Sequence, residues 1–106
     1  MKIRIKTCNI KKLQTYTIDS EQNVFTISGK PVEQNIEDAL IFIDTLTSSW
    51  PETLTDSNTQ DGLIVKIMIK DGIHNRTMLY KNKFPENFTL LTNFLNEVER
   101  NVSRTL

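Results

Sequence analysis

The sequence predicts an α+β fold, in which an antiparallel sheet of about five strands carries two helices packed on one face. Apolar and polar residues alternate near the start of the chain and again in its second half, which is the period of half-buried strands. Two other segments repeat apolar residues every three or four positions, as amphipathic helices do. The expected order is β-β-β-α-β-β-α. A length of 106 residues favours a single domain over residues 1–106.

Three strands are expected before the first helix. They span residues 1–7, 13–19 and 23–28. The first alternates strictly, with Ile3 and Ile5 on one face and basic side chains on the other. The connections between the three segments are short, and short connections favour antiparallel neighbours.

The first helix is expected to follow Gly29. Its apolar stripe consists of Val32, Ile36, Ala39, Leu40, Ile43 and Leu46. Pro31 suits the first helical position, where a missing N–H costs nothing. The helix should end near Trp50, because the residue before a proline is pushed out of the α region. Residues 51–60 are then expected to form a polar, mobile loop.

Two strands and a second helix complete the order. Residues 63–70 alternate, Asp71-Gly72 is typical of a hairpin turn, and residues 73–81 form the return strand. The facing of this strand stays open, because either His74, Arg76, Met78 and Tyr80 or Asn75, Thr77 and Leu79 could point to the core. The second helix is expected to open at Phe84-Pro85-Glu86. Its stripe consists of Phe88, Leu91, Leu95, Val98 and Val102.

Residues with catalytic or metal-binding chemistry are few. Cys8 and His74 are the only cysteine and histidine, so neither an intrachain disulfide nor a four-ligand zinc site can form. A Cys8–His74 dyad would require the first strand to lie beside the hairpin strand. Glycine-rich phosphate loops are absent. We therefore expect a protein that is not an enzyme and that holds no cofactor or metal.

Charge separates along the chain although the net charge is zero. Residues 1–12 hold basic side chains and no acid, residues 31–65 hold acids and no base, and residues 66–83 are again mainly basic. Basic residues alternate with the buried isoleucines, so they should share the open face of the sheet. The candidate partner-binding residues are Lys2, Arg4, Lys6, Lys66, Met68 and Lys70, with Arg76 if the return strand faces the same way.

This basic face predicts a small protein-binding module, such as an inhibitor, immunity or adaptor protein. The alternative ligand is a nucleic acid or another acidic ligand, which the neutral net charge and the few aromatic residues disfavour. A purely solvated face is the third interpretation, because an open antiparallel sheet needs a polar outer side. The element order is similar to that of small protease inhibitors of the emfourin type, in order alone.

The N-terminal residues and the lengths of the apolar segments predict where the protein is located, and the sheet edges bear on its assembly. The first residues lack the continuous apolar stretch of a signal peptide, and no segment is long and apolar enough to cross a bilayer. We therefore expect a soluble, cytoplasmic protein without a membrane partner. If the first or third strand lies at a sheet edge, edge pairing would produce a homodimer.

Overall fold

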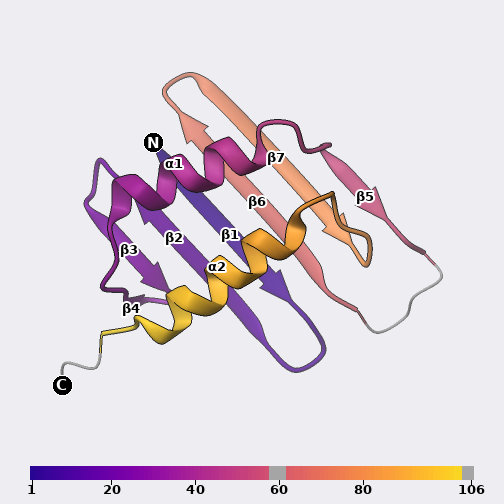
Figure 1. Ribbon diagram of the computed structural model, residues 1–106, viewed down its shortest axis with the longest axis horizontal. Helices are drawn as coiled ribbons and strands as arrows, with labels where there is room; N and C mark the ends of the chain where they lie inside the picture. Colours follow the sequence, from indigo (N-terminus) through magenta and orange to yellow (C-terminus); the bar gives the residue numbers. More distant parts are fainter. Residues whose placement is uncertain (58–61, 104–106) are drawn as a thin grey trace.

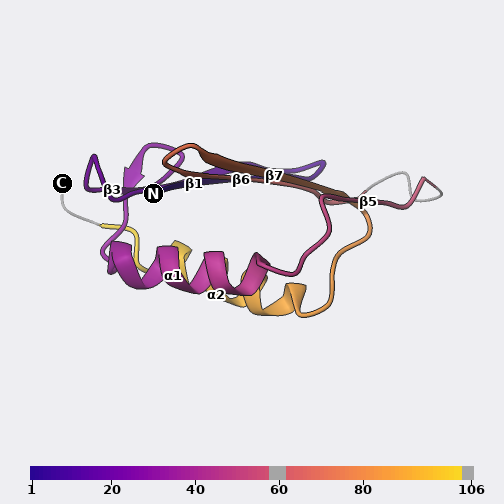
Figure 2. The same ribbon diagram turned by 90° about the horizontal axis from the view of Figure 1, so that it is seen from above.

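The computed structural model describes residues 1–57 and 62–103. In this part of the chain, seven strands form one sheet and two helices cover one of its faces (Figures 1 and 2). The strands are β1 (Lys2–Cys8), β2 (Leu13–Asp19), β3 (Val24–Ile27), β4 (Lys30–Pro31), β5 (Thr53–Thr55), β6 (Ile64–Asp71) and β7 (His74–Lys81). The helices are α1 (Ile36–Thr47) and α2 (Phe88–Arg100). The α+β class, with both helices on one face, is confirmed.

β1 lies at the centre of the sheet, whose strand order is β4-β3-β2-β1-β6-β7-β5. It pairs antiparallel with β2 on one side and with β6 on the other. Ile3 and Ile5 are fully buried beneath the helices, as the alternation predicts. The described strands leave β4 and β5 at the edges. Neither the first nor the third strand is a free edge, so the condition under which edge pairing would produce a homodimer is not met.

Two short strands extend the sheet beyond the expected order. β5 lies within the predicted loop and pairs parallel with β7, with Leu54 level with Tyr80. Leu79 N donates to Glu52 O at 2.8 Å, and Asp56 N donates to Lys81 O at 2.9 Å. The sheet is therefore mixed and seven-stranded rather than purely antiparallel with about five strands. Residues 58–60 of the predicted loop lie outside the described residues.

Both helices begin later than the sequence predicts. Pro31 belongs to β4, and Val32 N donates to Phe25 O at 2.9 Å, so these residues continue the sheet. Asn35 caps α1, because its side chain accepts a hydrogen bond from Asp38 N at 2.9 Å and satisfies a free N–H of the first turn. Asn87, with a φ of 66°, precedes α2.

One apolar core lies between the helices and the sheet. The strands contribute Ile3, Ile5, Tyr16, Ile18, Phe25, Ile27, Val65, Ile67, Ile69, Met78 and Tyr80, and the helices contribute Ala39, Leu40, Ile43, Phe88, Leu91, Leu95 and Val98. Met78 and Tyr80 are buried in this core, which settles the facing of β7. Arg76 alternates with them and therefore also lies on the helix side of the sheet.

Candidate functional site

The basic residues of β1 and β6 meet in register on the open face of the sheet. Lys2 lies opposite Lys70, Arg4 opposite Met68, and Lys6 opposite Lys66. The isoleucines between them point to the core, so the period of two places every one of these six side chains on the solvent side. We call Lys2, Arg4, Lys6, Lys66, Met68 and Lys70 the basic strip. Six of the seven residues predicted for a site are thus brought together.

Two of the three cross-strand pairs in the basic strip join like charges. Like charges directly opposite each other on antiparallel strands destabilise the pairing. None of the five basic side chains forms an ion pair with a residue of the described chain, where the two ion pairs present involve Lys12 and Arg76. The strip is therefore a positive field at the centre of the sheet, with one carboxylate, that of Asp19, opposite Lys2 on β2.

A hollow of about 90 Å³ lies within the strip, lined by Lys2, Arg4, Met68 and Lys70. Its volume is far below the roughly 300–1,000 Å³ of sites that enclose a drug-sized ligand. It therefore suits a single ionised group. Asp19 lies opposite Lys2 on β2, and one oxygen of its carboxylate accepts bonds from Glu21 N at 3.0 Å and Gln22 N at 3.2 Å.

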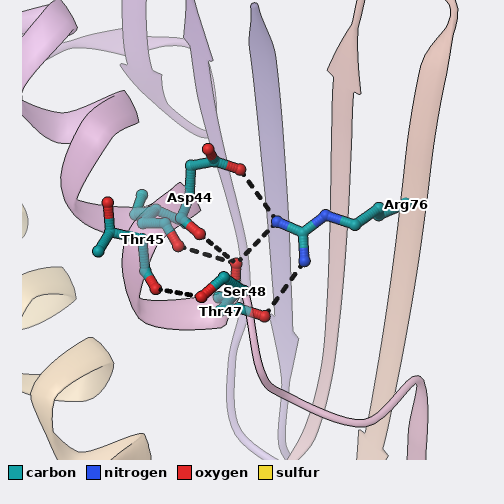
Figure 3. Close-up of polar contacts among 6 residues, drawn as sticks. Asp44, Thr45, Thr47, Ser48 and Arg76 are labelled. Atoms are coloured by element: carbon teal, nitrogen blue, oxygen red, sulfur yellow. Dashed lines mark hydrogen bonds and ion pairs between the residues drawn. The ribbon is translucent and has the colours of Figure 1, made fainter.

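Arg76 is not part of the basic strip. Its guanidinium lies on the helix side, 3.0 Å from the carboxylate of Asp44 (Figure 3). It also donates to the carbonyl oxygen of Thr47 at 3.1 Å and to the hydroxyl of Thr47 at 3.2 Å. Arg76 therefore links β7 to the last turn of α1. The expectation that Arg76 would join the site required β7 to turn this residue to the open face of the sheet, and it does not.

Cys8 and His74 lie at opposite ends of the sheet and form no dyad. Cys8 is level with Ile64 at the start of β6, and His74 is level with Asp71 at its end. Seven residues of strand separate the two levels, roughly 23 Å at the usual rise per residue. Among the described residues, no three His, Cys, Asp or Glu side chains are grouped in a way that could hold a metal ion.

The two tyrosines with shifted pKa values lie in the core side of the sheet, away from the strip. Burial raises the pKa of Tyr16 above its usual range, and the hydrogen bond from its hydroxyl to Glu99 at 3.0 Å adds to the shift. Burial raises the pKa of Tyr80 to about 12, against a smaller lowering effect of Arg76. Both hydroxyls act as hydrogen-bond donors inside the fold.

The structure also contains a surface that sequence reasoning missed. α1 and α2 leave a groove between them, and large apolar side chains are open to water beside it. Phe42 is 37 % exposed and Leu90 48 %, and both line the groove. Ile41 of α1 is 63 % exposed and lies outside this lining. The sequence indicated this surface only in one way: each helix contains more apolar residues than its buried stripe requires. How these residues combine depends on the placement of two helices that lie far apart in the sequence.

No protein family, curated protein or solved structure matches the chain. Neither helix in the described ranges is long and apolar enough to cross a membrane. The function therefore has to be inferred from the residues themselves.

Proposed function

We propose that the protein is a non-enzymatic protein-binding module whose basic strip receives an acidic segment of a partner. The observation that carries this proposal is the pairing of like charges at the centre of the sheet. A solvated face needs only polar side chains, and opposite charges would satisfy that need at lower cost. Like charges in register are expected where a partner supplies the opposite sign.

The hollow supports a specific mode of binding. A carboxylate of the partner placed there would meet Lys2, Arg4 and Lys70, and its aliphatic carbons would rest on Met68. Methionine is unbranched and polarizable, so it adapts to such a contact. The strand backbone beneath is rigid, which reduces the entropy lost on binding. Neighbouring acidic residues of the partner would extend along the strip to Lys6 and Lys66.

Nucleic acid is the alternative ligand for a positive face. Proteins that bind single strands combine such a face with aromatic side chains on which bases stack. The aromatic residues in the described strands are Tyr16, Phe25 and Tyr80, and all three are buried beneath the helices. The open face therefore offers charge without a stacking platform, which favours a protein partner over a nucleic acid. Our proposal places this partner in the cytoplasm.

The test compares two variants with the same change in net charge. Lys66→Glu with Lys70→Glu reverses two of the five charges of the strip, whereas Lys30→Glu with Lys83→Glu alters exposed lysines outside it. Immobilised wild-type protein should capture a specific partner from cell lysate. The control variant should capture the same partner, and the strip variant should lose it. Capture that survives the change of these two strip lysines to glutamate would remove this face from consideration.

A second measurement separates the two ligand classes. Retention of the protein on heparin and on single-stranded DNA is compared at about 50 mM salt, where phosphate contacts are strong. The protein-binding proposal predicts no retention on single-stranded DNA. Retention that the strip variant loses and the control variant keeps would instead favour nucleic acid as the ligand.

A further inference from the structure

A groove of about 460 Å³ separates α1 from α2, on the side of the molecule opposite the basic strip. Ala39 and Phe42 of α1 face Leu90 and Phe94 of α2 across it. The rings of Phe42 and Phe94 touch, with centroids 5.0 Å apart, and form an apolar floor. Phe42 and Leu90 remain partly open to water. Apolar surface gathered in this way is typical of an interaction site.

The rim of this helix groove is acidic. Asp38 and Glu97 both line it, and neither forms an ion pair with a described residue. α1 contains no basic side chain, and Arg100, the basic residue of α2, forms no ion pair with a described residue. An occupant must therefore combine an apolar side chain for the floor with a positive charge for the rim.

The turn between β1 and β2 has this chemistry. Ile10 at its tip is 79 % exposed, and Leu13 just after it is 66 % exposed. Lys11 lies between them and has no ion pair within the described chain. The turn extends past the helices at the end of the sheet (Figure 1). The other turn with a strongly exposed apolar side chain, Ile73 at 91 %, carries Asp71 and Gly72 in place of lysines.

The turn is held in a fixed shape before any contact forms. The side-chain oxygen of Asn9 accepts bonds from Lys11 N at 2.9 Å and Lys12 N at 2.8 Å. The backbones of Asn9 and Lys12 also bond to each other, at 3.0 and 3.4 Å. A preformed turn loses little conformational entropy when it docks.

We propose that the helix groove of one copy receives the β1–β2 turn of a second copy. Ile10 packs on Phe42 and Leu90, and Lys11 reaches the carboxylates of Asp38 and Glu97. The contact cannot close within one copy, because the turn lies on the other side of α2, where Lys12 pairs with Glu99 at 3.7 Å. Each copy offers one turn and one groove, so the contact is head-to-tail.

The test uses a turn variant and a groove variant, each with a matched control. The turn variant is Ile10→Ser with Lys11→Ser, and its control, Ile73→Ser with Lys83→Ser, alters another exposed turn and an exposed lysine. The groove variant is Asp38→Lys with Glu97→Lys. Its control, Glu37→Lys with Glu86→Lys, changes exposed acids that do not line the groove.

Light scattering over a concentration series gives the mass of each protein. The mass of the wild type and of both controls should rise with concentration. The turn and groove variants should each remain monomeric at concentrations where the wild type associates, because loss of the Ile10 contact or of the charge pair raises the dissociation constant about tenfold or more. An equimolar mixture of the two variants should form a 1:1 dimer and stop there, because one intact turn and one intact groove remain.

Three results would overturn the proposal. The wild type could stay monomeric throughout the series, or a control could lose association together with its matched variant. The third such result is that the mixture of the two variants forms no dimer. Circular dichroism verifies the fold of each variant. If the groove variant does not fold, Leu90→Ser, at a half-exposed position, replaces it in the same measurements. None of these results bears on the basic strip, which lies on the opposite face.

Discussion

Arg76 shows how the environment of one guanidinium decides between a structural and a binding role. The ion pair with Asp44 is partly open to water, with side chains 38 % and 45 % exposed, so it contributes less than about 1 kcal/mol by itself. The bond to the carbonyl of Thr47 adds to this, because the last turn of a helix has free carbonyl groups. A cation near the helix C-terminus also opposes the helix dipole favourably.

We expect Arg76→Ala to lower the free energy of unfolding by about 1–2 kcal/mol, since three hydrogen bonds are lost together. Urea denaturation measures this change. Lys70→Ala serves as the control and should not lower stability, because the side chain of Lys70 forms no hydrogen bond or ion pair in the described chain and lies opposite Lys2. If the two variants had equal stability, Arg76 would not tie α1 to the sheet.

At the scale of elements, Tyr80 connects three segments of the chain. Its hydroxyl donates to the carbonyl of Pro51 at 2.6 Å, just before β5. Its ring meets Trp50 after α1 and Phe88 in α2, with centroids 6.0 and 6.5 Å apart. The residue therefore helps to hold the segment that adds β5 to the sheet.

The raised pKa of Tyr80 predicts a loss of stability in alkali. The folded state favours the neutral phenol, whose pKa is about 12 against an ordinary value of 10.0. This contribution is complete below pH 10 and is lost as the pH rises from 10 to about 12. Tyr80→Phe should therefore show a shallower decline in urea midpoint over that range than the wild type. Tyr16 is present in both proteins, and parallel declines would contradict the prediction.

The sequence predicted the long strands but not the short ones, for a physical reason. β1 and β6 alternate over seven and eight residues, so their pattern is local and strong. β5 has three residues and exists because β7 offers it a pairing edge. Pro31 fits the start of a helix by local geometry, yet the bond from Val32 to β3 makes this segment part of the sheet. Tertiary contacts overrode local preference at both places.

The candidate sites divide in the same way at the scale of the whole molecule. The basic strip could be predicted because the period of two fixes which side chains share a face. Cross-strand register, which brings lysine against lysine, became known only from the structure. The helix groove depends on two helices separated by forty residues of chain. The sequence pattern therefore did not indicate that its carboxylates and its apolar floor lie together.

The two faces of the molecule have opposite charge, and this separation should cost stability. Lys66 is exposed and lies opposite Lys6, so the pair repels in the folded protein and is free to separate when the chain unfolds. Lys66→Glu converts the repulsion into attraction. We expect the free energy of unfolding to rise by about 0.5 kcal/mol at low salt. This gain should fade near 1 M salt, where the screening length is about 3 Å.

Urea denaturation at low and high salt checks this expectation, with Lys83→Glu as the control for the change in net charge. Lys83 is exposed and lies outside the strands, so its reversal should change stability little. A variant that is more stable and yet fails to capture the partner would separate binding from folding in one substitution. A loss of stability in Lys66→Glu would mean that the paired lysines do not repel, and the observation that carries the binding proposal would no longer hold.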